Sequence, residues 1–112
     1  MSLRHFFRRP ETVTAAEAAS LVTGGSAIIL DVRRTADWQR NHIPGAMHIP
    51  LDALAIRAEE LPDGYRIITF CTGGLLSSGA ANLLVELGFD AVNMAGGLID
   101  WRSSGGSLTS TA

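Results

Sequence analysis

Two short apolar segments, residues 27–30 and 67–70, constrain the fold of this chain most strongly. Each predicts a strand rather than a helix, because it is about one helical turn long and lies between turn-forming or charged residues. Runs without polar alternation are typical of strands that are buried on both faces. Such strands occur in parallel sheets, whose connecting helices cover both faces through right-handed crossovers. We therefore expect an α/β fold with an open parallel sheet and helices on both of its faces.

The remaining elements are predicted from capping, periodicity and turn signals. Thr14 and Glu17 have the spacing of a capping box, and Gly24-Gly25 ends the alanine-rich stretch that follows them. Leucine and alanine recur at helical spacing in the segment before Gly88. Besides the two strands above, we expect helices over residues 14–22, 51–61 and 98–102, a helix capped by Ser77 or Ser78, a helical turn over residues 35–39, and strands over residues 47–49 and 91–94.

A chain of 112 residues has room for one hydrophobic core, and its composition of 46% hydrophobic and 18% charged residues is that of a globular protein. We expect a single domain over residues 1–102. Residues 103–112 are mostly serine, glycine and threonine. A segment of this composition buries too little apolar surface to offset its loss of conformational entropy, so we expect a flexible C-terminal tail.

Charge and hydropathy exclude several classes of partner. The formal net charge is −2, and the nine basic residues, all of them arginine, form no long stripe, so we expect no nucleic-acid binding. No apolar run approaches the roughly 18 residues that span a bilayer, and the opening segment lacks a signal-peptide core. We therefore expect a soluble, cytoplasmic protein with no membrane partner. No motif implies a cofactor.

Cys71 is the single cysteine of the chain, which excludes an intramolecular disulfide and any multi-cysteine metal site. It follows a predicted buried strand and precedes Thr72-Gly73-Gly74, whose glycines allow a tight loop. Open parallel sheets bind ligands beyond the carboxyl ends of their strands, where residues 31–33 also lie. The alternative is a buried structural cysteine, which is equally common for this residue type. Its position favours a reactive thiol.

A reactive thiol needs a source of stabilisation for its anion. A free thiol titrates near about 8.5, so only about 3% of it is the nucleophilic thiolate at neutral pH. A helix dipole contributes about 0.3 to 1 kcal/mol, whereas each hydrogen bond to a charged acceptor contributes about 1.5 to 3 kcal/mol. We therefore expect the backbone amides of residues 72–77 to point inward around the sulfur of Cys71. A sulfur sealed in the apolar interior, with these amides turned away, would exclude catalysis.

Four separated motifs share an order and spacing with a known family. They are Asp31-Val32-Arg33 at a strand end, the sequence Asn-His-Ile-Pro-Gly-Ala over residues 41–46, Cys71-Thr72-Gly73-Gly74, and Gly96-Gly97 followed by Trp101. Together they resemble the rhodanese-like domains over about residues 14–101, although the family usually has glycine where this chain has Asn41. The resemblance implies a five-stranded parallel sheet and a sulfurtransferase that moves sulfane sulfur through a persulfide on Cys71.

The resemblance also implies a set of site residues. The expected substrate-binding loop consists of Thr72, Gly73, Gly74, Leu75, Leu76 and Ser77. Arg33 could reach this loop from the neighbouring strand end. From its position alone, Asp31 could orient Arg33 or a loop amide, although an aspartate at a strand end is just as often a turn former. The position of His42 predicts that it supports the Ile-Pro-Gly bend through backbone hydrogen bonds. The expected partners are a small sulfur donor, such as thiosulfate or a persulfide, and a sulfur-relay protein.

One departure bears on the donor. Active members of the family often carry arginine or lysine in the loop, where this chain has Leu75 and Leu76. We therefore expect thiosulfate to be a poor donor and a less charged persulfide, on a small molecule or another protein, to be a better one. A phosphatase is improbable, because related folds need an arginine six positions after the cysteine and Ser77 occupies that position. The alternative function is a non-catalytic rhodanese-like module that binds or regulates a partner.

Overall fold

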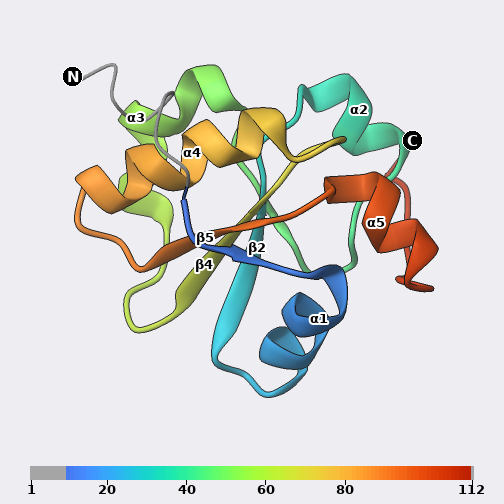
Figure 1. Cartoon of the computed structure of the whole chain (residues 1–112). Coiled ribbons are helices and arrows are strands. Elements are labelled where there is room, and N and C mark those ends of the chain that lie inside the picture. Colours follow the sequence, from blue (N-terminus) through green and yellow to red (C-terminus); the bar gives the residue numbers. More distant parts are fainter. Residues whose placement is uncertain (1–9, 112) are drawn as a thin grey trace.

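The computed structural model describes residues 10–111 and has the expected α/β fold. Its sheet has five parallel strands in the order β1-β5-β4-β2-β3 (Figure 1). The strands are β1 (Thr12–Val13), β2 (Ala27–Asp31), β3 (Met47–His48), β4 (Arg66–Phe70) and β5 (Ala91–Met94). The two strands that the apolar runs predict, β2 and β4, are neighbours at the centre, and their register pairs Ala27 with Arg66 and Asp31 with Phe70.

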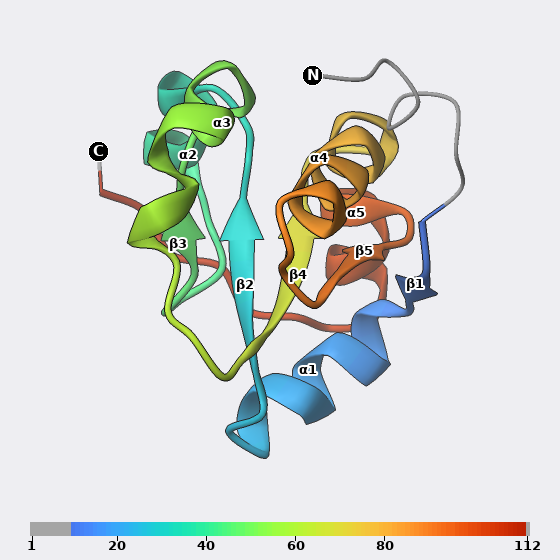
Figure 2. The same cartoon turned by 90° about the vertical axis from the view of Figure 1, so that its left-hand side faces the viewer.

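Helices cover both faces of this sheet (Figure 2). They are α1 (Ala15–Thr23), α2 (Thr35–Arg40), α3 (Leu54–Arg57), α4 (Leu75–Glu86) and α5 (Gly97–Ser103). Strand residues alternate between two cores, one that packs with α3 and α4 and one that packs with α1 and α5. Along β4, for example, Ile67 belongs to the first core and Ile68 and Phe70 to the second. None of the helices within residues 10–111 is long and apolar enough to span a bilayer.

The predicted ends of several elements agree with the structure. Thr14 caps α1, and both bonds of its capping box with Glu17 are present.

The predicted helix over residues 51–61 is broken into a 3₁₀ turn η2 (Leu51–Ala53), the single turn α3 and a second 3₁₀ turn η3 (Ala58–Glu60). β1 was not predicted, because its two residues give too short a pattern to read.

The predicted cap of α4 is wrong. The helix begins at Leu75, so its N-cap is Gly74, which has a φ of 93° that favours glycine. Ser77 lies inside the first turn and is fully buried, and its hydroxyl group points to the sulfur of Cys71 instead of capping the helix. The preference of serine for N-cap positions is therefore overridden here by a buried hydrogen bond.

The structure describes the segment for which a flexible tail is expected as far as residue 111. Residues 104–111 follow the surface of the domain, where Thr109 exchanges two backbone hydrogen bonds of 2.8 Å with His42. The indole Nε1 of Trp101 donates to the carbonyl oxygen of Ser107 at 2.9 Å, and Leu108 packs against the α1 and α5 core. The small polar side chains of residues 104–111 do not predict these contacts, because most of the contacts are made by backbone groups. Residues 1–9 of the expected domain and residue 112 lie outside the described residues.

Candidate active site

Cys71 directly follows β4, and three donors from the next turn surround its sulfur. The backbone N–H groups of Gly74 and Ser77 lie 3.1 and 3.3 Å from Sγ, and the Ser77 hydroxyl group lies 3.2 Å from it. Cys71 is only 3% exposed, but it lines a pocket at this end of the sheet. Three donors on one sulfur atom stabilise negative charge there. The amide cradle expected from the sequence is thus present at two positions of the loop, with a hydroxyl group added.

Two buried polar side chains, those of Thr69 and Asn93, hold Gly74 and Ser77 in place. Thr69 on β4 and Asn93 on β5 are register partners on the face that α4 covers. The Thr69 hydroxyl group donates to the carbonyl oxygen of Ser77 at 2.7 Å, and the Asn93 amide donates to the carbonyl oxygen of Gly74 at 3.1 Å. These bonds fix the positions of the residues whose N–H groups point to the sulfur of Cys71.

The beginning of α5 holds the other side of the loop. The backbone N–H groups of Leu98 and Ile99 donate to the carbonyl oxygens of Cys71 and Thr72 at 2.9 and 3.3 Å. This approach requires glycine at residue 97, because a Cβ atom there would collide with the Cys71 carbonyl oxygen, and its φ is 50°. The Gly96-Gly97 motif therefore docks α5 against the cysteine loop, backbone to backbone.

The pocket at Cys71 has a volume of about 220 Å³ and is bordered by residues of the loop and of the segment after β2. Its lining consists of Arg33, Arg34, Asp37, Cys71, Thr72, Gly73, Leu75 and Leu76. Leu75 and Leu76 are strongly exposed, at 84% and 55%. Six of the expected site residues thus meet at one pocket, while Gly74 and Ser77 lie beneath it against the sulfur.

Arg33 lies at this pocket, but its cationic group is already paired. Its guanidinium group binds the Asp31 carboxylate through Nε and Nη2, with a shortest distance of 2.7 Å, and donates to the backbone and side-chain oxygens of Asn41. It also lies 5.4 Å from the centre of the Phe70 ring. Both partners of the ion pair are buried. Asp31 therefore orients Arg33 and neutralises the charge that Arg33 could offer to a donor.

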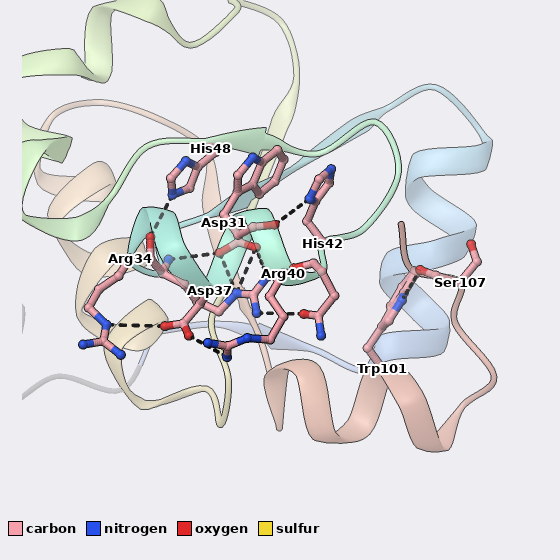
Figure 3. A network of polar contacts seen from close by, with 11 residues as sticks. Asp31, Arg34, Asp37, Arg40, His42, His48, Trp101 and Ser107 are labelled. Atoms are coloured by element: carbon pink, nitrogen blue, oxygen red, sulfur yellow. Dashed lines mark hydrogen bonds and ion pairs between the residues drawn. The ribbon is translucent and has the colours of Figure 1, made fainter. Parts of the chain in front are cut away.

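Arg34 also lines the pocket, although the sequence did not predict its place at the site. Its side chain is 87% exposed at the pocket, and its one ion pair in the described part of the chain is a 3.4 Å contact with Asp37. Arg40 approaches the same carboxylate at 3.3 Å, so two arginines share one acid (Figure 3). The only sequence signal was its position next to Arg33 after a strand. The pocket therefore has a cation beside the leucines of the loop, and the segment after β2 supplies it.

His42 lies away from the sulfur and supports the segment around α2. Its Nδ1 donates to the carbonyl oxygen of Trp38 at 2.7 Å, and its ring stacks on the Trp38 ring with 3.7 Å between centroids. His48 also stacks on Trp38, and its Nε2 donates to the carbonyl oxygen of Arg33 at 2.8 Å. His42 is thus part of the packing behind the pocket and does not contact Cys71.

Comparisons with known proteins bear on the family of this chain. The family model of the rhodanese-like domain matches residues 14–104. The Bacillus subtilis protein YrkF, provisionally named as a sulfur carrier, is 35% identical over an alignment that covers 88% of this chain and 60% of YrkF. A sulfurtransferase of Allochromatium vinosum is 30% identical over 79 residues, which cover 70% of this chain and 74% of that protein.

A solved structure gives the same result. The thiosulfate sulfurtransferase of Pseudomonas aeruginosa superposes with a TM-score of 0.80 at 27% identity, over 92% of this chain and 21% of that one. The chain spans less than two thirds of YrkF and a fifth of the Pseudomonas protein, so these relatives contain further sequence. The match of the family model over most of the chain, together with the parallel sheet and the cysteine loop, shows that this protein belongs to the rhodanese-like domain family.

Proposed function

We propose that this protein is a sulfurtransferase that carries sulfane sulfur as a persulfide on Cys71. The observation that carries the proposal is the set of three donors, two N–H groups and one hydroxyl group, around a sulfur that borders a pocket. A thiolate is the nucleophilic form of cysteine, and such donors stabilise it. Relatives named as a sulfurtransferase and as a sulfur carrier support the same chemistry.

The reaction has two steps that resemble thiol–disulfide exchange. In the first, the Cys71 thiolate attacks the outer sulfur of a donor R–S–SH, an Sγ–S bond forms, and the S–S bond of the donor breaks to release R–S⁻. In the second, a nucleophilic acceptor attacks the terminal sulfur of the Cys71 persulfide, takes it, and leaves the Cys71 thiolate. The Gly74 and Ser77 donors are in place for the thiolate at the start and at the end of this cycle.

Intact-mass spectrometry after incubation with a sulfane donor tests this proposal. We expect the protein to gain one sulfur atom on Cys71 and to lose it when cyanide is added, with release of thiocyanate. Cys71→Ser should gain nothing, which locates the sulfur. If the wild-type protein takes up no sulfur from thiosulfate or from any of several small persulfides, the protein is instead a non-catalytic module that has kept the fold.

A further inference from the structure

The helix α2 and the residue before it form part of the wall beside Cys71. Arg34, which precedes the helix, and Asp37 within it line the pocket at the cysteine loop. Arg34 and Thr35, the first residue of the helix, also line a second pocket of about 450 Å³, which shares Arg34 and Leu76 with the first one. Access to the sulfur from this side therefore depends on the position of α2.

This helix has little stability of its own. It has six residues, and helices this short are marginal in water unless they pack against other elements. None of its residues is buried, whereas each of the other α-helices within residues 10–111 buries at least one residue. Its half-buried Trp38 carries the stacked rings of His42 and His48. The helix is therefore held by contacts at its surface and not by side chains in the core.

The C-terminal segment completes the end of α2. The last carbonyl groups of a helix have no partner within the helix. The carbonyl oxygen of Gln39 accepts from the backbone N–H of Thr111 at 3.1 Å and from the hydroxyl group of Ser110 at 3.2 Å. Thr109 exchanges its two backbone bonds with His42, which follows the helix. We call residues 105–111 the strap.

The strap is fastened on the other side of the molecule from the pocket wall that it holds. Leu108 packs against the core of α1 and α5, and the carbonyl oxygen of Ser107 accepts from the indole of Trp101. The other polar tie of the α2 end is made by Asn41, whose backbone and side-chain oxygens accept from the buried Arg33. The strap thus links the α5 face of the sheet to the wall of the Cys71 pocket.

We infer that α2 is a lid on the Cys71 pocket and that the strap holds this lid shut. Release of the strap leaves α2 with the Asn41 tie and the rings on Trp38, and the helix then opens by local unfolding. The N–H donors of Gly74 and Ser77 belong to the start of α4, so opening changes access to the sulfur but not the stabilisation of its anion. The lid goes beyond the proposed function, because it controls access to the thiol whatever the thiol transfers.

Two reagents with the same reactive group measure this access. N-methylmaleimide and N-(1-pyrenyl)maleimide both add to the Cys71 thiolate, but the second carries a bulky ring system. The ratio of their rate constants cancels the fraction of thiolate and reports access alone. Leu108→Ala removes the apolar anchor of the strap, and we expect it to raise the pyrenyl-to-methyl ratio about threefold over wild type, because local opening becomes more frequent. Truncation after Ser104 removes the whole strap and should raise the ratio about tenfold.

Leu21→Ala is the matched control. Leu21 is also a partly buried leucine that packs against the α1 and α5 core, but it belongs to α1 and not to the strap. We expect this variant to lose a similar free energy of unfolding and to keep the ratio within about 1.5-fold of wild type, because the strap is intact. Circular dichroism shows whether each variant is folded under the labelling conditions. If the truncated protein is unfolded, Leu108→Ala decides alone.

Hydrogen exchange locates the opening. In Leu108→Ala the amides of α2 should exchange faster than in wild type, while those of β4 should keep their protection. The inference is overturned if Leu108→Ala leaves the labelling ratio unchanged, if Leu21→Ala raises the ratio equally, or if the protection of α2 does not change. Labelling by maleimides requires no sulfur transfer, so each of these results leaves the proposed function to its own test.

Discussion

At the scale of single residues, the chemistry depends on which groups face the sulfur of Cys71. The Ser77 hydroxyl group is fully buried and donates to Sγ, while the Ser77 backbone N–H donates to the same atom. One residue thus provides two of the three donors. In related cysteine-loop enzymes this position would carry the arginine for a phosphoryl group, whereas here its backbone N–H and its hydroxyl group donate to the cysteine sulfur.

Replacement of Ser77 by alanine isolates the hydroxyl group from the amide. Because the N–H groups remain, we expect Ser77→Ala to fold and to lose one of the three hydrogen bonds that stabilise the thiolate. A bond to a charged acceptor contributes about 1.5 to 3 kcal/mol, so sulfur uptake should slow by about tenfold or more. Stopped-flow measurement of persulfide formation checks this. Ser78→Ala removes a hydroxyl group from the next residue and should react at the wild-type rate.

Thr69 does not contact the sulfur of Cys71, but it holds Ser77, which does. Thr69→Val keeps the shape of the side chain but removes the 2.7 Å bond to the Ser77 carbonyl oxygen. We expect a loss of about 1 kcal/mol in the free energy of unfolding and slower alkylation of Cys71 by iodoacetamide at neutral pH. Thr69→Ser retains the hydroxyl group and should restore the alkylation rate even if stability stays below wild type. Equal alkylation rates in all three proteins would remove Thr69 from this role.

At the scale of elements, α5 has a task that its short length would not suggest. Its first two N–H groups after Gly97 donate to the carbonyl oxygens of Cys71 and Thr72, so the helix holds the backbone of the cysteine loop. This arrangement joins two sequence motifs that are some 25 residues apart, the cysteine loop and Gly96-Gly97. The buried side chain of Trp101 anchors α5 to the core.

Gly97→Ala should damage both stability and reactivity. The added Cβ atom would collide with the carbonyl oxygen of Cys71, and the positive φ adds backbone strain. We expect a loss of about 3 kcal/mol in urea unfolding, together with slower sulfur uptake. Gly105→Ala is the control for strain alone, because Gly105 has a φ of 84° but no atom near its Cβ position. It should cost about 1 kcal/mol and leave sulfur uptake unchanged.

The sequence predicted the elements that have strong local signals. The continuous apolar runs predicted β2 and β4, and the capping box predicted the start of α1. Elements fixed by tertiary contacts were missed or misplaced. β1 has only two residues and is defined by its pairing with β5, and the helix predicted over residues 51–61 is divided into η2, α3 and η3. Local periodicity carries no information about such pairing or breaks.

The site could be predicted in the same uneven way. Cys71 and its loop follow from a strand end before glycines, which is a local pattern. The pairing of Arg33 with Asp31 and Asn41, and the place of Arg34 at the pocket, depend on how α2 lies over the ends of the strands. Ser77 was expected in the loop, but its contact with the sulfur requires α4 to begin three or four residues earlier than a cap at Ser77 or Ser78 predicts.

At the scale of the whole molecule, the last described residues complete the packing of the α1 and α5 face. Gly106 lies flat against the Trp101 indole, where a Cβ atom would collide with the ring. Thr109 pairs with His42 and thereby ties the end of the chain to the segment between α2 and β3. The domain is thus closed by a segment whose composition alone predicted flexibility.

Truncation after Ser104 measures what this segment contributes. Loss of the Thr109 pairing, the Ser107 bond to Trp101 and the Leu108 contact should lower the free energy of unfolding by about 2 to 3 kcal/mol in urea denaturation. Leu108→Ala in the full chain should account for about 1 kcal/mol of this loss. An unchanged midpoint after truncation would show that residues 105–111 do not stabilise the fold in solution.

The near-complete burial of Cys71 has a consequence for the order of events. Cys71 is 3% exposed and borders a pocket that Arg34 and Leu76 also line, so a spent donor that remains in this pocket blocks the approach of an acceptor. Departure of the first product must then precede entry of the second reactant. Double-reciprocal plots of initial rate against donor concentration, at several fixed acceptor concentrations, should give parallel lines. This is the kinetic pattern of two half-reactions that use the same pocket in turn.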